Sequence, residues 1–412
     1  MRRKKRQVTQ SALAEPGFRR YFPASWFSGL GSWMLRFLLG WSAWELTASA
    51  TWVGLVAALM LGPALLLSPW FGILSDRINP RHGLIASMLV HTAIALSGAG
   101  ALWWETFDRD VLVCLAVAMG VVTSGHSPMR LALIPMLVDR AALPSAVGLS
   151  ATTFNIARIL GPALGALLLA RAGAAASFTL AAGLFAVAAL ILISLRQVGQ
   201  RAPRSHESYV QQFKAGLRYV GLHPGIQLAF ACTVLNGLLG RTVVELLPAL
   251  AGGFLGGDST ALAILTASAG VGSILGGLVM AQQRADNEHL FRVVMLALLA
   301  ASVLLLAVAS SREIVRLSLL VLIISGLTTI AGTGSQTITQ LCLVEEYRGR
   351  VMSLWTLLAM GAPALGSAMW GVAADQVGFP SIAAVAGTTG VLLAAFLYAR
   401  RQALSGMTNW KG

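Results

Sequence analysis

Charged side chains inside long apolar runs are the residues of this sequence best placed to do chemistry. At the centre of a membrane helix, an Asp, Lys or Arg costs about 2.5–3.5 kcal/mol on insertion scales, so such a residue should face a cavity or a partner. Five charged residues occupy such positions: Arg36, Arg130, Arg158, Arg241 and Glu245. Four of the five are cationic, and they predict a basic interior that attracts an anionic ligand or a carboxylate partner.

Two acidic residues are candidates for moving a proton or closing a gate. Arg241 and Glu245 are four residues apart and can pair along one helix. We expect an ion pair at an outer gate, with Glu245 the best candidate for a proton carrier. Glu45 lies at the end of the first apolar run, where it either belongs to the same gate or only marks the helix end.

Polar and aromatic side chains in the apolar runs are candidates for contacts with a substrate. His126 and Arg130 share a helix face, and His126 would titrate near neutral pH if it is functional or make a packing hydrogen bond if it is structural. Trp33 either stacks on a ligand or anchors a helix, and the amides either contact substrate or join helices. The candidate substrate-binding residues are Trp33, Arg36, His126, Arg130, Asn155, Arg158, Asn236, Gln336 and Gln340.

The composition defines the class of protein that positions these residues. The chain has 412 residues, of which 56% are hydrophobic and 11% charged, whereas a soluble domain has about 25% charged residues. Apolar segments of membrane-spanning length are predicted near 24–46, 51–71, 83–104, 111–134, 146–170, 175–195, 226–250, 260–281, 292–310, 316–341, 351–373 and 379–399. The expected fold is an all-α membrane protein of twelve transmembrane helices in two pseudo-symmetric six-helix bundles. We expect no metal site and no cofactor, since the three cysteines lie in apolar segments without ligand spacing.

The distribution of positive charge predicts the orientation and the domains. Four Lys/Arg residues lie in the predicted outer loops and four within helices, and the rest of the 30 lie on the other side, which we assign to the cytoplasm. Both termini are therefore expected inside, and the net charge of +14 reflects topology instead of nucleic-acid binding. The predicted parts are a basic tail (1–23), a first bundle (24–195), an amphipathic cytoplasmic linker (196–224), a second bundle (225–399) and a cytoplasmic tail (400–412).

Short matches between the halves suggest duplication. The segment from Pro162 to Gly165 reads Pro-Ala-Leu-Gly and recurs from Pro363 to Gly366. Repeated halves around a site near the midplane are a recurring design of transporters.

A loop between the second and third apolar runs carries the strongest local motif, Gly72-Ile-Leu-Ser-Asp-Arg-Ile-Asn-Pro-Arg-His-Gly83. It resembles the signature loop of the major facilitator superfamily, although Asn79-Pro80 replaces the usual glycine. The resemblance implies that Asp76 docks near Arg350 and that Arg77 or Arg81 pairs near Asp139. The implied inner gate is Gly72, Asp76, Arg77, Arg81, Asp139 and Arg350. Solvated charges that only set topology are the alternative.

A glycine–proline element in the fifth apolar run, Gly161-Pro162-Ala-Leu-Gly165, predicts close helix packing and a bend. It is similar to an element of the superfamily's exporters. Together with Phe213–Val220 and Glu346–Ser353, it resembles the branch that contains enterobactin exporters and macrolide efflux proteins.

This resemblance implies a monomeric, proton-coupled exporter in the bacterial inner membrane. Its partners would be protons, the lipid bilayer and a small amphipathic, siderophore-like metabolite or a drug. An importer or facilitator of an anionic solute is the alternative. The sequence lacks the phosphate-binding pattern G-x-x-x-x-G-K-[ST], which argues against nucleotide-driven transport, and it lacks the clustered His, Asp and Glu residues of a membrane enzyme.

Overall fold

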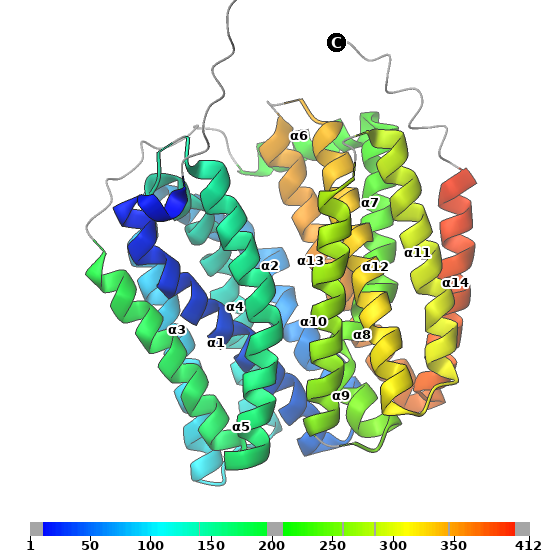
Figure 1. The fold of residues 1–412 in the computed structure, drawn as a ribbon, viewed down its shortest axis with the longest axis horizontal. Coiled ribbons are helices and arrows are strands. Elements are labelled where there is room, and N and C mark those ends of the chain that lie inside the picture. The colour runs from blue at the N-terminus through cyan, green and yellow to red at the C-terminus, as the bar shows by residue number, and fades with distance from the viewer. Residues whose placement is uncertain are drawn as a thin grey trace, which may run out of the picture. The chain divides into compact units, whose positions relative to one another are not determined.

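The computed structural model describes residues 11–139, 141–195, 209–257, 259–283, 286–344 and 347–399. Every regular element in these ranges is helical (Figure 1). The long helices are α1 (Pro16–Thr47), α2 (Ala50–Arg77), α3 (Pro80–Trp103), α4 (Arg109–Leu133), α5 (Leu143–Ser194), α10 (Ser259–Ala281), α11 (Asn287–Ala309), α12 (Ile314–Leu341), α13 (Arg348–Val377) and α14 (Phe379–Ala399). The shorter elements are η1 (Ala12–Ala14), η2 (Ile134–Met136), α6 (Tyr209–Leu222), α7 (Pro224–Asn236), η3 (Gly237–Arg241), α8 (Thr242–Glu245), α9 (Leu247–Ala249) and η4 (Leu250–Phe254).

Ten stretches of the described chain are long and apolar enough to cross a membrane. One of them is α5, whose 52 residues are two helices joined at Gly173, where φ is 82° and ψ is 176°. A positive φ of this size favours glycine because it has no Cβ. The chain is therefore a multi-pass α-helical membrane protein.

Contacts divide the chain into two compact units, which we treat separately. Unit 1 comprises residues up to Leu38 together with Leu66–Ser205, and unit 2 comprises Leu39–Leu65 together with His206–Gly412. The end of α1 and the start of α2 thus belong to unit 2.

Unit 1 is built from α3, α4 and α5 with the first part of α1. Fully buried aromatic side chains of α5, Phe178 and Phe185, lie at its core. The first helix starts at Pro16, inside the predicted 1–23 tail, because the preceding residues are anchored in the unit: Ala12 is buried and donates its backbone N–H to the Ser145 hydroxyl (3.1 Å).

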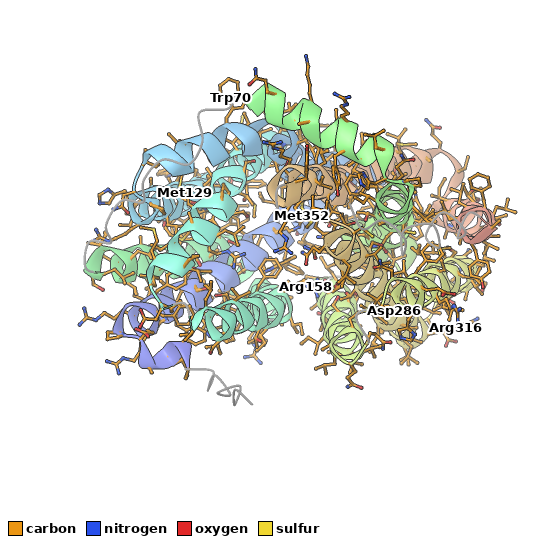
Figure 2. All side chains as sticks on the ribbon, turned by 90° about the horizontal axis from the view of Figure 1, so that it is seen from above. Trp70, Met129, Arg158, Asp286, Arg316 and Met352 are labelled. Carbon is orange, nitrogen blue, oxygen red and sulfur yellow. The ribbon has the colours of Figure 1, made fainter. Side chains whose placement is uncertain are left out.

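Unit 2 packs α10 and α11 on α12, and α14 on α11, around a core that includes Phe291, Val294 and Leu298. Figure 2 shows α6, in pale green, lying crosswise to helices seen end-on. Its apolar residues Phe213 and Tyr219 pack with Val351 and Leu354 of the start of α13. The described part of the predicted linker is thus helical, and its apolar side chains are partly covered by protein, whereas Leu217 and Leu222 are exposed.

Candidate functional site

The polar centre of unit 2 forms where the seventh predicted helix loses regular geometry. After Asn236, residues Gly237–Arg241 adopt a π-helix, and a second π-helix spans Leu250–Phe254. Such widened turns are rare and concentrate at functional sites. Gly237 and Gly240 favour the irregularity, since glycine contributes little helix propensity and allows neighbouring side chains to approach.

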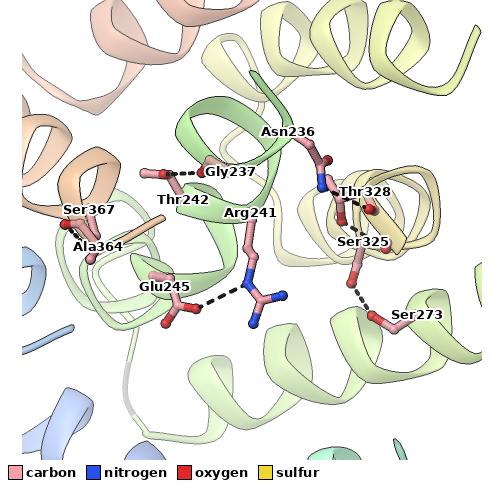
Figure 3. A network of polar contacts seen from close by, with 10 residues as sticks. All are labelled: Asn236, Gly237, Arg241, Thr242, Glu245, Ser273, Ser325, Thr328, Ala364 and Ser367. Carbon is pink, nitrogen blue, oxygen red and sulfur yellow. Dashed lines mark hydrogen bonds and ion pairs between the residues drawn. The ribbon is translucent and has the colours of Figure 1, made fainter. Parts of the chain in front are cut away.

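Asn236 joins this region to α12. Its amide nitrogen donates to the Thr328 carbonyl oxygen (3.1 Å), whereas its Oδ1 atom is buried and accepts no hydrogen bond among the described residues (Figure 3). A buried polar atom costs free energy when it has no partner. The free acceptor fits a site that receives a donor from a ligand.

Arg241 and Glu245 follow directly on the same irregular segment. The Arg241 Nε and Glu245 Oε1 atoms are 3.9 Å apart, and Glu245 is the better buried partner, with 10% of its side chain exposed against 36% for Arg241 (Figure 3). The spacing of four residues therefore brings the two side chains together as expected. Glu45, at the end of α1, is exposed.

Hydroxyl groups line the neighbouring contact between α10 and α12. The hydroxyls of Ser273 and Ser325 are 2.7 Å apart, and the Ser325 hydroxyl is also 2.6 Å from the Ala269 carbonyl oxygen. Further along α12, Gln336 is half-buried and Gln340 is exposed. Of the predicted contacts in unit 2, Asn236 thus lies deepest.

Trp33 and Arg36 form the corresponding polar site of unit 1. The Arg36 guanidinium lies over the Trp33 ring, 5.6 Å from its centroid, and Phe154 of α5 meets the same ring edge-on at 5.6 Å. Arg158 follows Phe154 by one turn and is half-buried. The side chain of Asn155 lies outside the described residues.

A second polar cluster in unit 1 contains a histidine that sequence reasoning missed. His126 Nδ1 lies 3.2 Å from the Ser87 hydroxyl, and His91 Nδ1 donates to the Ser87 carbonyl oxygen (2.8 Å) while its ring stacks on Phe185 at 4.7 Å. His91 was recognisable as a polar residue four positions after a serine in an apolar run. Arg130 is one turn beyond His126 on α4.

The helix-five element forms a close contact inside unit 1. A Cβ atom on Gly161 would lie 2.8 Å from the Trp33 Cβ and 2.9 Å from the Leu30 carbonyl oxygen, and one on Gly165 would lie 3.1 Å from the Phe37 ring. The two glycines thus let α5 pack directly on α1, as the motif predicts, and Pro162 lies inside α5.

The predicted inner gate is described only in part. Gly72, Asp76 and Arg77 lie near the end of α2, but their side chains are outside the described residues. Asn79 caps α3 by accepting the Arg81 backbone N–H (3.0 Å), and Pro80 occupies the first helical position. An asparagine cap followed by proline starts a helix well, which explains how the turn is kept without the usual glycine.

Arg81, Asp139 and Arg350 are the gate residues whose side chains the structure describes. Arg81 is buried, and its guanidinium donates to the carbonyl oxygens of Leu192 (2.9 Å) and Ile193 (2.6 Å), so it ties the start of α3 to the end of α5 instead of pairing with Asp139. Asp139 is exposed. The guanidinium of Arg350 lies over the Tyr347 ring at 5.4 Å.

Comparisons with known proteins identify the family. The family described as transmembrane secretion effector matches residues 8–409. The staphyloferrin A transporter of Staphylococcus aureus is 23% identical over 92% of this chain and 94% of its own. The enterobactin exporter EntS of Shigella boydii is 26% identical over 86% and 85%, and macrolide efflux protein A of Streptococcus pyogenes is 22% identical over 81% and 83%.

Solved structures share the fold. A bacterial homologue of the lysosomal transporter Spinster, in an inward-facing and unoccupied conformation, matches with a TM-score of 0.71 and 14% identity over 93% of this chain and 95% of its own. The nucleoside transporter NupG matches with a TM-score of 0.71 and 12% identity over 96% and 100%. The protein thus belongs to the transmembrane secretion effector family of major facilitator superfamily transporters and is a membrane transporter, not an enzyme.

Proposed function

We propose that the protein is a proton-coupled exporter of small, amphipathic and partly anionic metabolites of the siderophore type, or of a drug. The observation that carries the proposal is the kinship with transporters named for staphyloferrin A, enterobactin and macrolides. The glycine–proline element that packs α5 on α1 adds support, since it is similar to that of the superfamily's exporters. The excess of arginine over acid in the spanning helices favours an anionic group on the substrate.

The proposed topology has twelve spanning helices in two related six-helix halves. Counting the two parts of α5 separately and adding α1 brings the ten candidate spans to twelve. Both termini lie in the cytoplasm of this arrangement, because most Lys/Arg residues are on that side. The bacterial relatives favour the inner membrane as its location.

Each unit supplies candidate substrate contacts in this proposal. In unit 1 the aromatic and cationic pair Trp33–Arg36 offers a stacking surface with a positive charge. In unit 2 the unpartnered Oδ1 atom of Asn236 offers an acceptor. The other candidates are Asn155, Arg158, His126, Arg130, Gln336 and Gln340.

Glu245 is the proposed carrier of the coupling proton. Protonation neutralises the carboxylate and removes the charge that attracts Arg241, so proton binding changes the free energy of the irregular segment that both residues occupy. A change of charge state at a bistable element is how protons drive conformational switches.

The test measures both the substrate and the coupling. Spent medium and cell extracts are profiled by mass spectrometry with and without the protein, in iron-rich and iron-starved cultures. We expect an anionic metabolite to rise in the medium and to fall in the cells. Accumulation in the cells would instead indicate an importer or facilitator, and no change under iron starvation would contradict the siderophore-type substrate.

A matched pair of variants tests the proton carrier. Glu245→Gln is expected to abolish the dependence of transport on a pH gradient. Glu288→Gln is the control, because Glu288 also pairs with an arginine four residues on, Arg292, but both of those side chains are largely exposed. Normal proton-dependent transport by Glu245→Gln would remove Glu245 from this role.

A further inference from the structure

The turn between α1 and α2 is short, and its backbone adopts an unfavourable conformation. Only Ala48 and Ser49 separate the two helices, and Ala48 has a φ of 47°, which an alanine adopts at a cost. Such a conformation persists only where the surrounding structure holds it in place. The first backbone N–H groups of α2 also require acceptors, because a helix cannot satisfy them internally.

Asp375, near the end of α13, supplies those acceptors. Its Oδ1 accepts the Ala50 N–H (2.8 Å), and its Oδ2 accepts the Thr51 N–H (2.9 Å) and the Ser49 hydroxyl (2.5 Å). A carboxylate at a helix N-terminus gains from both the hydrogen bonds and the helix dipole. One side chain therefore holds the turn and the start of α2 on another helix.

The residue that caps α2 is distant in sequence, unlike the residues that cap α4 and α11. Asp108 caps α4 by accepting the Val111 N–H (2.9 Å), and Asp286 caps α11 by accepting the His289 N–H (2.8 Å). Each of these acids directly precedes the helix that it caps, whereas Asp375 follows Ser49 by more than 300 residues. The cap of α2 exists only while the two helix ends are together.

The backbones of α2 and α13 meet beside this cap. A Cβ atom on Gly54 would collide with the Ser367 carbonyl oxygen, and one on Gly371 would collide with that of Ala50. The Ser367 hydroxyl also points to the Gly54 carbonyl oxygen, at 3.4 Å. Surfaces packed this closely are bistable: they are either in contact or separated, and intermediate arrangements are not favoured.

We propose that Asp375 is a positioning residue of the transport cycle, a latch that holds the α1–α2 turn on the end of α13 in one conformation and releases it in the other. The inference rests on the proposed alternating access of two six-helix halves, since α1 and α2 belong to the first half of the sequence and α13 to the second. Opening the transporter at this end then requires the carboxylate to leave the start of α2. Loss of the latch favours the conformation open at this end.

Accessibility of a single cysteine tests the latch. Ser367 is fully buried in the α2–α13 contact, so Ser367→Cys is introduced into the full-length protein after replacement of Cys114, Cys232 and Cys342 by alanine. Labelling by a membrane-impermeant maleimide is then followed in membranes. We expect Asp375→Ala to label about tenfold faster than the parent and Ser49→Ala about threefold faster, in line with the range measured for lost helix caps.

Asp108→Ala is the matched control, because it removes a carboxylate cap that is local to its own helix. We expect it to label within about twofold of the parent. Equal labelling of Asp375→Ala and the parent would overturn the latch, and so would equal acceleration by Asp108→Ala. If Asp375→Ala does not fold, the near-isosteric Asp375→Asn is expected to label severalfold faster and is judged by the same criterion.

The readout separates the latch from the proposed export. Labelling requires no substrate, so faster labelling of Asp375→Ala in a protein that exports nothing would support the latch while contradicting the export. Confirmed export together with unchanged labelling would reject the latch alone.

Discussion

The two Pro-Ala-Leu-Gly segments make similar contacts in the two units, which differ in other respects. In unit 1, Gly165 of α5 packs on Phe37 and Met34 of α1, one turn after Gly161 packs on Trp33. In unit 2, Gly366 of α13 packs on the start of α8 and on Leu238 of η3, where a Cβ atom would collide with the Thr242 hydroxyl. Each segment thus lies against the first helix of its own half of the sequence, which supports the proposed duplication.

The two helices against which the Pro-Ala-Leu-Gly segments pack differ from each other. The first helix is α-helical throughout, and its arginine, Arg36, rests on an aromatic ring. Its counterpart is interrupted by two π-helices, and its arginine, Arg241, faces a carboxylate. The two helices thus differ in the regularity of their backbone and in the partner of their arginine, and the ion pair lies on the helix with π-helical turns, which are frequent at functional sites.

The largest expected effect comes from filling the glycine contacts. Gly165→Leu and Gly366→Leu should each destabilise the protein by about 3 kcal/mol or more, because the new side chain meets a buried side chain or a neighbouring backbone. The measurement is the monodisperse fraction after heating, followed by size-exclusion chromatography in detergent. Gly183→Ala in α5 is the control, since its Cβ would meet no atom within 4 Å. Tolerance of one leucine variant and not the other would show that the two contacts are not equivalent.

Removal of the Arg81 side chain should have the next largest effect. Arg81→Leu leaves the carbonyl oxygens of Leu192 and Ile193 without their charged donor and should cost about 2–3 kcal/mol. Arg292→Leu removes a guanidinium from the exposed pair with Glu288 in unit 2 and should leave the stability almost unchanged. Thermal unfolding of the purified variants provides the comparison, and equal stabilities would show that Arg81 does not tie α3 to α5.

Loss of the Arg241–Glu245 ion pair is expected to destabilise the protein less than loss of Arg81, and a second substitution should reverse part of that destabilisation. Arg241→Leu should cost about 1–2 kcal/mol, since Glu245 is mostly buried while Arg241 is partly exposed. Arg36→Leu, which loses a contact with an aromatic ring, should cost about 0.5–1 kcal/mol. Adding Glu245→Gln to Arg241→Leu should recover part of the lost stability. Adding Glu245→Gln to Arg36→Leu should recover none of it. Additive losses in a double-mutant cycle would contradict the pairing.

The smallest effect concerns the reactivity of Cys342, just beyond the end of α12. Burial raises the pKa of this thiol to about 11, opposed by a hydrogen bond from the Asn287 amide. Because the thiolate is the reactive form, maleimide labelling at pH 8 should be slow and should rise about tenfold per pH unit up to about pH 11. The measurement uses a protein with Cys114 and Cys232 replaced by alanine. A plateau near pH 9 would show that the end of α12 is not packed on α11.

Local properties of the sequence determined much of this protein. Hydropathy predicted apolar helices of spanning length, of which the described chain has ten candidates, because a membrane helix must satisfy its own backbone. The four-residue spacing of Arg241 and Glu245 predicted their approach because that spacing is about one helical turn. The glycines of the fifth helix likewise predicted a close contact. The ion pair was predictable because its two residues are near in sequence, and the apolar segments were predictable because their solvent is the lipid, whereas the glycines predicted a close contact without specifying the partner helix.

Only the tertiary structure decided which distant groups meet. Only the structure shows that Arg81 binds the end of α5 and that Asp375 caps α2. The π-helix after Asn236 was also unforeseen. These features depend on acceptors, donors and neighbouring backbones contributed by other helices, and periodicity within one segment carries no information about them.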